Sequence, residues 1–414
     1  MDKIIFHIDF DSYFASAHRV INPQYDNKPI AIGRKLRRSI ACSVSYELKN
    51  KGAKSGWPNY KILELEPRTI FIEPDFNLYI TLSNKIFNFI AQKYTKNIEV
   101  YSIDECWLDA SEMCKNKDPE LLARKMQRQI REKFRIPISV GISHNKFLAK
   151  LSTNLAKPYG VLHTTWDDIE KRIWPLEIEE YFGIGKSTAL KLRAIGINTI
   201  GDLAARDVHD PYLYTVFRSL TKDYVLQARG EGPNKLNYEH NELKSIGNEL
   251  TFLSFDIDER EEILKILYQL CKKVSLRAKN RNLLGYVITF SMRTVDKTWF
   301  RKQQSIKIPT NDTEEIYEIG SRIFNKVFND EYIRGIGIKL SSLVNEFDTY
   351  KPQSLFDTNV QTNTIEKDQI TQLIDKINTK IKKKGLKIAS EFVKDEIKDN
   401  IHSRYLDTDL EVKN

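Results

Sequence analysis

Two short apolar runs, each ending in acidic residues, constrain the fold of this chain more than any other feature of the sequence. The first covers residues 4–8 and is followed by Asp9 and Asp11, and the second covers residues 98–103 and is followed by Asp104-Glu105. A short apolar run without helical spacing is typical of a strand that is buried on both faces. If the two strands are neighbours in one sheet, their acidic ends lie close together.

Strand and helix patterns alternate along most of the chain. Helical spacing at 82–90 and 121–134, with a third apolar run at 138–142, predicts an α/β domain in which helices pack on a sheet. Short helices broken by glycines follow, and a polar stretch at 231–243 then predicts a linker. Beyond the linker, helical spacing over 263–274 and two further apolar runs predict a second, smaller α/β module.

The composition is that of an ordinary soluble globular protein, with 41% hydrophobic and 29% charged residues. A net charge of +9 suits a polyanionic partner such as nucleic acid, although many basic proteins bind none. The four cysteines form no CxxC pair, so neither a zinc ribbon nor a disulfide framework is indicated. The first apolar run is too short for a signal peptide or a membrane span. We therefore expect a cytoplasmic, nucleoid-associated protein that does not use a membrane.

The paired acidic strand ends suggest a specific chemistry. Phosphoryl transfer to a hydroxyl uses two cations about 3.5–4 Å apart, and such cations need hard oxygen ligands. Two adjacent strand ends that carry carboxylates provide these ligands. The alternative is that the same acidic residues cap helices or face solvent, which is common at strand ends.

Three sequence strings decide between these alternatives. They are Ile-Asp-Phe-Asp-Ser-Tyr-Phe-Ala-Ser at 8–16, Tyr-Ser-Ile-Asp-Glu-Cys-Trp-Leu-Asp at 101–109, and Val-Gly-Ile-Ser-His-Asn-Lys-Phe-Leu-Ala-Lys at 140–150, which continues through Ala-Lys-Pro-Tyr-Gly at 156–160. In this order and spacing they resemble the motifs of Y-family translesion DNA polymerases, the DinB- and UmuC-like enzymes. The resemblance extends over roughly residues 3–345. It implies a template-directed DNA polymerase that adds dNTPs to a primer 3′-hydroxyl, with low fidelity and without proofreading.

The resemblance also implies a set of catalytic residues. Asp9 and Asp104 are expected to bridge two Mg²⁺ ions, for which Mn²⁺ is the expected substitute. Glu105 is expected to hold the metal at the primer terminus, and the carbonyl oxygen of Phe10 to complete the coordination of the nucleotide-bound metal. Asp11 is expected to support the site and not to bind a metal.

A second set of residues is expected to hold the incoming nucleotide. Phe14 lies where the family places its steric gate, a planar side chain that excludes a 2′-hydroxyl. Ser43, Tyr46 and Lys49 recur at a spacing of three in the fingers motif and, with Lys157, are expected to contact the triphosphate. Lys49 departs from the commoner pattern, because most relatives have Arg at this position. Without the family resemblance, Phe14 is a plain core aromatic, and the two lysines are solvated surface charges.

Two further segments are expected to bind DNA. Residues 182–190 and 196–200 resemble a helix-hairpin-helix, whose turn offers Gly183, Gly185 and Lys186 to a DNA phosphate independently of sequence. A P-loop is only weakly indicated, because Glu180 stands where that motif needs its first glycine. A purely structural turn between two helices is the alternative.

The second α/β module resembles the little finger of the family. Residues 244–249 resemble its opening strand, and basic residues on or near the predicted strands are expected to contact DNA phosphates, namely Arg293, Arg301 and Arg334. Just beyond this module, Gln353, Leu355 and Phe356 resemble a peptide that docks on the replicative sliding clamp, although the motif is one residue short. A disordered tail is the equal alternative for this segment.

The expected fold is therefore an α/β (α+β) multidomain right-hand polymerase. Its expected parts are the palm at 1–10 and 75–165, the fingers at 11–74, the helical thumb at 166–230, the linker at 231–243, the little finger at 244–345 and the tail at 346–414. The expected partners are primer-template DNA, dNTPs and the sliding clamp, and the protein is expected to be a monomer. The alternatives are a catalytically weak DNA-binding accessory protein of the same fold and another two-metal nucleotidyl enzyme, such as a cyclase.

Overall fold

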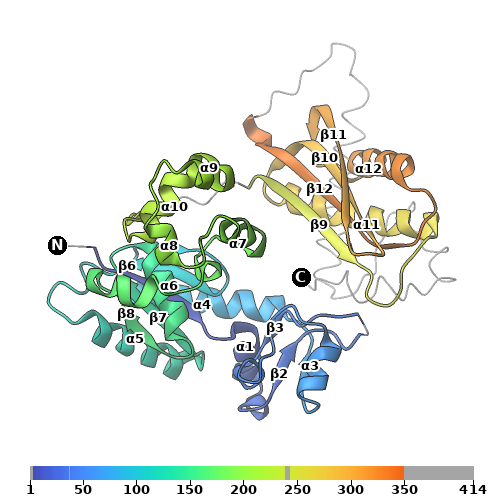
Figure 1. Ribbon diagram of the computed structural model, residues 1–414. Coiled ribbons are helices and arrows are strands. Elements are labelled where there is room, and N and C mark those ends of the chain that lie inside the picture. Colours follow the sequence, from blue (N-terminus) through green and yellow to red (C-terminus); the bar gives the residue numbers. More distant parts are fainter. Residues whose placement is uncertain (1–2, 37, 238–242, 349–414) are drawn as a thin grey trace. The chain divides into compact units, whose positions relative to one another are not determined.

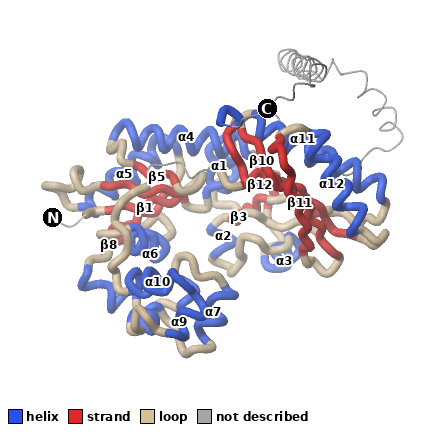
Figure 2. The backbone as a smooth tube through the Cα atoms, turned by 90° about the horizontal axis from the view of Figure 1, so that it is seen from above, coloured by secondary structure: helices blue, strands red, loops and turns tan. Residues whose placement is uncertain are grey.

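The computed structural model describes residues 3–36, 38–237 and 243–348 of the chain (Figure 1). The chain divides into two compact units, Met1–His240 and Asn241–Asn414. Each unit contains both sheets and helices, so the predicted α/β class is confirmed (Figure 2).

A five-stranded sheet forms the centre of the N-terminal unit, with the strand order β5-β6-β1-β7-β8. Its strands are β1 (Ile5–Phe10), β5 (Ile98–Val100), β6 (Glu105–Asp109), β7 (Ile138–Ser143) and β8 (Val161–His163). The central strand β1 pairs with β6 and with β7, antiparallel in both cases. All six residues of β1 are buried, as the apolar run predicts for a strand covered on both faces.

Helices cover both faces of this sheet. On one face, α4 (Phe76–Lys93) and α5 (Pro119–Phe134) share a hydrophobic core with Phe6, Ile8 and Phe10 of β1. On the other face, α6 (Lys146–Ala156) packs against β1 and β7. Because side chains alternate along a strand, Ile5, His7 and Asp9 face α6. This alternation directs the first acidic residue towards the lysines of the third sequence motif.

Two further groups of elements complete the N-terminal unit. The small sheet β3-β2-β4 packs with short helices, and these elements are β2 (Ile30–Ile32), β3 (Ser43–Val44), β4 (Ile70–Ile72), α1 (Tyr13–Ile21), α2 (Tyr46–Lys49) and α3 (Asn59–Leu65). A separate apolar cluster joins the helices α7 (Lys186–Arg193), α8 (Ile200–Ala204), α9 (Pro211–Phe217) and α10 (Thr221–Ala228). The short helices expected after residue 165 are therefore confirmed.

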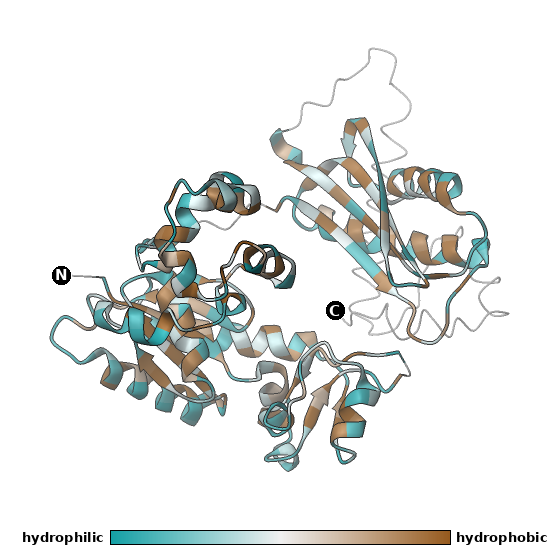
Figure 3. Ribbon diagram, viewed as in Figure 1, coloured by the Kyte–Doolittle hydropathy of each residue, from teal (hydrophilic) through white to brown (hydrophobic). Residues whose placement is uncertain are grey.

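The C-terminal unit is an antiparallel sheet with two helices, and its strand order is β11-β10-β12-β9. Its elements are β9 (Ser245–Thr251), α11 (Arg260–Lys279), β10 (Leu283–Thr294), β11 (Trp299–Thr310), α12 (Thr313–Val327) and β12 (Ile333–Asn345). The helices share one hydrophobic core with the sheet. Figure 3 shows hydrophobic and hydrophilic residues alternating along both helices, as expected for helices that bury one face.

Two details of the predicted strands are wrong. The strand expected at 98–103 ends at Val100, and the chain turns back so that β6 begins at Glu105 and pairs with β5 in a hairpin. The acidic pair therefore lies at the turn of a hairpin and not at the end of one long strand. In addition, β1 extends to Phe10, so Asp9 is part of the strand and does not follow it.

Membrane crossing receives no support from these elements, since none of the helices in the described part of the chain is long and apolar enough to span a bilayer.

Because α6 packs closely on β7, position 141 has no room for a side chain, which can be tested. A Cβ atom on this residue would lie 2.1 Å from the carbonyl oxygen of Ala149 and 2.2 Å from the backbone nitrogen of Thr153. Because both neighbours are backbone atoms of the helix, Gly141→Ala must push α6 away from the sheet. We expect it to lower the free energy of unfolding by about 2 kcal/mol or more in a urea titration.

Gly185→Ala is the matched control, because a Cβ atom there has no neighbour within 4 Å. Its cost should stay below about 1 kcal/mol, the cost of replacing glycine by alanine at the N-cap residue that precedes α7. Equal stability of Gly141→Ala and wild type would contradict the described packing.

Candidate active site

The two acidic segments meet across neighbouring strands. In the antiparallel register of β1 and β6, Asp9 lies directly opposite Glu105. The backbone N–H of Phe10 donates a hydrogen bond to the carbonyl oxygen of Asp104 at 2.9 Å, which ties the turn before β6 to the end of β1. The acidic residues that are about 95 positions apart in the sequence are thus brought together by strand pairing alone.

Two lysines neutralise this acidic cluster. The ammonium nitrogen of Lys157 lies 2.6 Å from Oδ2 of Asp9, and that of Lys150 lies 2.7 Å from Oε1 of Glu105. Lys150 is on α6 and is buried beside the rings of Tyr101, Trp107 and Phe182.

Lys150 is not among the site residues expected from the sequence, although it lies inside the third motif. Its helix, α6, packs on the face of the sheet towards which Asp9 points. The alternation of side chains along β1 was therefore the signal in the sequence that could have identified Lys150.

Burial sets the protonation of the two facing carboxylates. Burial, with Glu105 as a neighbour, raises the pKa of Asp9 to about 7, although the ammonium of Lys157 acts in the opposite direction. Burial also acts to raise the pKa of Glu105, but hydrogen bonds from Asp9 and Lys150 outweigh it and hold that pKa below its usual value. The pair therefore holds one proton readily near neutral pH, and an added cation would displace it.

The donor atoms suit a hard divalent cation. Carboxylate oxygens of Asp9 and Glu105 face each other, and the lysine ammonium groups already stand as cations on both of them. Asp104 currently accepts a hydrogen bond from Oγ of Ser102 at 2.6 Å. Among the residues that the structure describes, no three His, Cys, Asp or Glu side chains are grouped as ligands of one metal.

Asp11 is held by protein groups. Its buried carboxylate accepts hydrogen bonds from Oγ of Ser139 at 2.9 Å, from the backbone nitrogen of Tyr159 at 2.8 Å and from the hydroxyl of Tyr46 at 3.2 Å. These donors come from three separate segments. Asp11 therefore links the main sheet to α2, which agrees with the supporting role expected from the sequence.

Three of the residues expected at the nucleotide, Tyr46, Lys49 and Lys157, lie beside the same cluster. The ammonium of Lys49 lies 4.4 Å from the centre of the Tyr46 ring. Burial and the neighbouring Lys157 lower the pKa of Lys49, whereas Asp9, Asp11 and Asp104 raise it. The acidic residues and the expected phosphate-binding lysines thus share one electrostatic environment. Ser43 is on β3, opposite Ile32, and the structure gives its side chain no contact to this cluster.

Phe14 is a rigidly held aromatic at the start of α1. Its ring stacks on that of Tyr79 with 4.1 Å between the centroids and 8° between the planes, and it meets Phe76 edge to face. Tyr79 is itself fully buried, and its hydroxyl is hydrogen-bonded to Nε2 of His18 at 2.9 Å. A ring fixed in this way keeps its position against a ligand.

The residues expected at DNA have mixed surroundings. Gly183 (φ 103°), Gly185 and Lys186 are exposed at the turn that leads into α7. In the C-terminal unit, Arg301 is half exposed and pairs with Glu249, whereas Arg334 forms a double contact to Asp256 at 3.1 and 3.2 Å and is largely buried.

The remaining expected contacts are those of Arg293 and of the clamp-binding peptide. Arg293 donates to the hydroxyl of Thr251 at 3.0 Å. The expected clamp-binding residues Gln353, Leu355 and Phe356 lie outside the described residues.

Comparison with known proteins extends over almost the whole chain. Residues 8–154 match the model of the impB/mucB/samB family, and residues 243–355 match the model of the C-terminal domain of that family. The chain is 31% identical over 382 residues to DNA polymerase IV of Bacillus velezensis, which covers 91% of this chain and 90% of that protein. It is also 31% identical over 405 residues to DNA polymerase IV 1 of Bacillus subtilis, with 94% of both proteins covered.

Solved structures agree with these relatives. A Y-family DNA polymerase chimera superposes with a TM-score of 0.71 and 26% identity, covering 83% of this chain and 99% of that chain. The chain belongs to the Y family of DNA polymerases. As a Y-family polymerase it is a DNA-directed DNA polymerase of the translesion type, so the activity expected from the sequence is confirmed. The alternative of a catalytically weak accessory protein is not favoured.

If Asp9 is a metal ligand of this Y-family polymerase, as expected from the sequence, its raised pKa predicts pH-dependent metal binding. A metal needs the ionised carboxylate, and a pKa of about 7 means that protonation competes with the metal as the pH falls from 8 to 6. We expect Mn²⁺ binding, followed by the loss of the free-ion electron paramagnetic resonance signal, to be roughly tenfold weaker at pH 6 than at pH 8.

Two variants control this measurement. Asp9→Asn should weaken Mn²⁺ binding at pH 8 and remove most of the difference between the two pH values. Glu112→Gln makes the same charge change at an exposed position and should behave as wild type. Equal Mn²⁺ affinity of the wild type at pH 6 and pH 8 would contradict the combination of a raised Asp9 pKa and metal binding by Asp9.

Proposed function

We propose that Asp9, Asp104 and Glu105 hold two Mg²⁺ ions and are the catalytic carboxylates of this polymerase. The observation that supports this most is the strand register, which sets Asp9 opposite Glu105 with Asp104 in the adjoining turn. The carbonyl oxygen of Phe10 is the proposed fourth protein ligand, because it follows Asp9 directly. When bound, two such ions activate the primer 3′-hydroxyl and neutralise the charge of the leaving pyrophosphate.

The side chains of the cluster have distinct tasks in this proposal. Asp9 and Asp104 would hold both ions, and Glu105 would hold the ion at the primer terminus. Lys157, which lies on the carboxylate of Asp9, would then be available to the phosphates of the dNTP. Lys150 keeps Glu105 ionised and oriented through its 2.7 Å contact. If a divalent cation replaces the ammonium of Lys157 beside Asp9, the buried carboxylate of Asp9 still has a cation next to it.

The triphosphate is proposed to lie between α1, α2 and the cluster. The first turn of α1 supplies backbone N–H groups and the positive end of a helix dipole. Ser43, Tyr46 and Lys49 contribute a hydroxyl, a phenol and a point charge from the strand β3 and the helix α2. Phe14 lies under the sugar and acts as the steric gate.

Primer-template DNA and dNTPs are the proposed partners. One similar solved structure, with 26% identity and a TM-score of 0.54, is the insertion ternary complex of Dbh DNA polymerase. Gly183, Gly185 and Lys186 are proposed to contact a DNA phosphate, as are Arg293 and Arg301 of the C-terminal unit. Arg334 would first have to leave Asp256, so its pair with this residue argues for a structural role.

The remaining assignments extend the same proposal. The proposed division into palm, fingers, thumb and little finger is the one expected from the sequence, with the linker at 231–243. Sliding-clamp binding by Gln353, Leu355 and Phe356, a monomeric state and a place near the nucleoid complete it.

Primer extension tests the proposed carboxylates. Wild type should extend a primer in the presence of Mg²⁺, and Asp104→Asn should reduce the rate by at least about a thousandfold, because one bridging charge is lost from the metal site. Asp118→Asn is a matched control at the exposed start of α5 and should extend as wild type. Extension by Asp104→Asn within tenfold of wild type would refute the assignment of this residue.

The choice between dNTPs and rNTPs tests Phe14 separately. Removal of the ring in Phe14→Ala should raise the ratio of kcat/KM for rNTPs to that for dNTPs by about a hundredfold, since the barrier to a 2′-hydroxyl is steric. The neighbouring Phe76→Ala, which removes an exposed ring from the same aromatic group, should leave the ratio nearly unchanged. An unaltered ratio in Phe14→Ala would assign this side chain to the core alone.

A further inference from the structure

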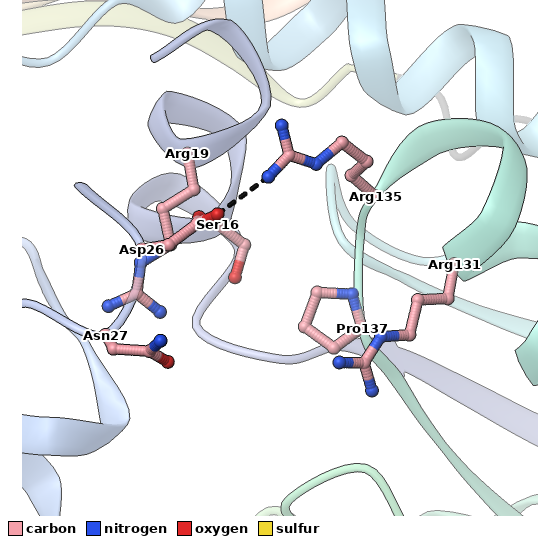
Figure 4. A pocket seen from close by; sticks show the side chains of 7 residues that line it. All are labelled: Ser16, Arg19, Asp26, Asn27, Arg131, Arg135 and Pro137. Atoms are coloured by element: carbon pink, nitrogen blue, oxygen red, sulfur yellow. Dashed lines mark hydrogen bonds and ion pairs between the residues drawn. The ribbon is translucent and has the colours of Figure 1, made fainter. Parts of the chain in front are cut away.

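A second basic site lies behind Asp11. A cavity of about 350 Å³ opens there, lined by arginines from α1, from the last turn of α5 and from the residue that ends this helix. Figure 4 shows Arg19 on one side of the opening, Arg131 on the other, and Arg135 reaching across to Asp26. This volume suits one compact ligand and not a folded partner.

The guanidinium groups keep donors for a ligand. Arg131 stacks on the ring of Tyr159 at 4.4 Å and forms no ion pair with any residue in the described part of the chain. Arg135 uses one terminal nitrogen for Asp26. Arg19 uses Nε and Nη2 for two carbonyl oxygens and for Glu47, so its Nη1 takes no part in these bonds. Guanidinium forks of this kind match phosphate oxygens in pairs.

The cavity is joined to the active site through a single residue. Its wall includes Ser16, whose hydroxyl donates to the carbonyl oxygen of Asp11 at 2.7 Å, and Pro137, whose carbonyl accepts from the N–H of Asp11 at 2.9 Å. Tyr159, under Arg131, donates its N–H to the carboxylate of Asp11. On its other side, Asp11 accepts from Tyr46, a proposed triphosphate contact.

We propose that this cavity binds inorganic pyrophosphate, the second product of the reaction, outside the nucleotide site. Only Asp11 separates the cavity wall from Tyr46, a proposed triphosphate contact. This position and the limited volume of the cavity favour released pyrophosphate over a segment of DNA. Arg135 neutralises Asp26 at 2.7 Å and Arg19 pairs with Glu47 at 2.8 Å, so Arg131 supplies the net positive charge of the cavity and the other two arginines supply N–H donors. The choice of pyrophosphate rests on the proposed function, whereas binding itself requires no catalysis.

Calorimetric titration of the full-length protein with sodium pyrophosphate, without metal or DNA, tests the proposal. Arg131→Gln should bind pyrophosphate at the cavity roughly tenfold more weakly, the usual effect of losing one charge-assisted contact. Arg124→Gln removes the same charge from the same helix two turns away and should bind as wild type. Lys157→Gln, which alters the nucleotide site, should retain cavity binding.

Several results would overturn the proposal. They are the absence of pyrophosphate binding in the wild type, wild-type affinity in Arg131→Gln, loss of all binding in Lys157→Gln, and an Arg131→Gln protein that loses affinity for single-stranded DNA alone. If Arg131→Gln unfolds at a lower temperature than wild type, Arg135→Asn decides instead, because Asn tolerates the positive φ of 58° at this position. Failure of the proposed polymerase mechanism would appear in primer extension and leave this titration unchanged.

Discussion

The antiparallel pairing of β1 with β6 determines where the chemistry of this protein takes place. A shift of one residue in that register would turn Asp9 to the face of α4 and α5, into a hydrophobic core, and would separate it from Glu105. The hydrogen bond from Phe10 to Asp104 fixes the same register at its last step. The apolar residues of β1 thus do more than build a core, because their burial holds the carboxylates in one place.

Burial of these carboxylates has an electrostatic cost that the fold offsets with lysines. Asp9 would be strongly destabilised as an isolated buried anion, and burial raises its pKa even though Lys157 acts in the opposite direction. Hydrogen bonds from Lys150 and Asp9 hold the pKa of Glu105 below its usual value. Carboxylate oxygens gathered in this way are the ligands that divalent cations prefer.

The α/β class and the buried strand β1 could be predicted from the sequence because both depend on local patterns of apolar residues. The apolar run before Asp9 implied a strand covered on both faces, and all six residues of β1 are buried. The hairpin at 98–109 was missed, since the run from Ile98 to Ile103 contains no glycine or proline to mark the turn at Ser102. Lys150 and the donors to Asp11 were missed for another reason: they depend on contacts between segments far apart in the chain, which no local pattern records.

Anomalous diffraction at the manganese edge tests the central claim most directly, with crystals of the protein bound to primer-template DNA, a non-hydrolysable dNTP analogue and Mn²⁺. The account predicts two peaks about 3.5–4 Å apart, both touched by Asp9 and Asp104, with Lys157 turned from Asp9 to the phosphates. Absence of any peak beside Asp9, with Lys157 still on its carboxylate in a complex that holds the nucleotide, would contradict it.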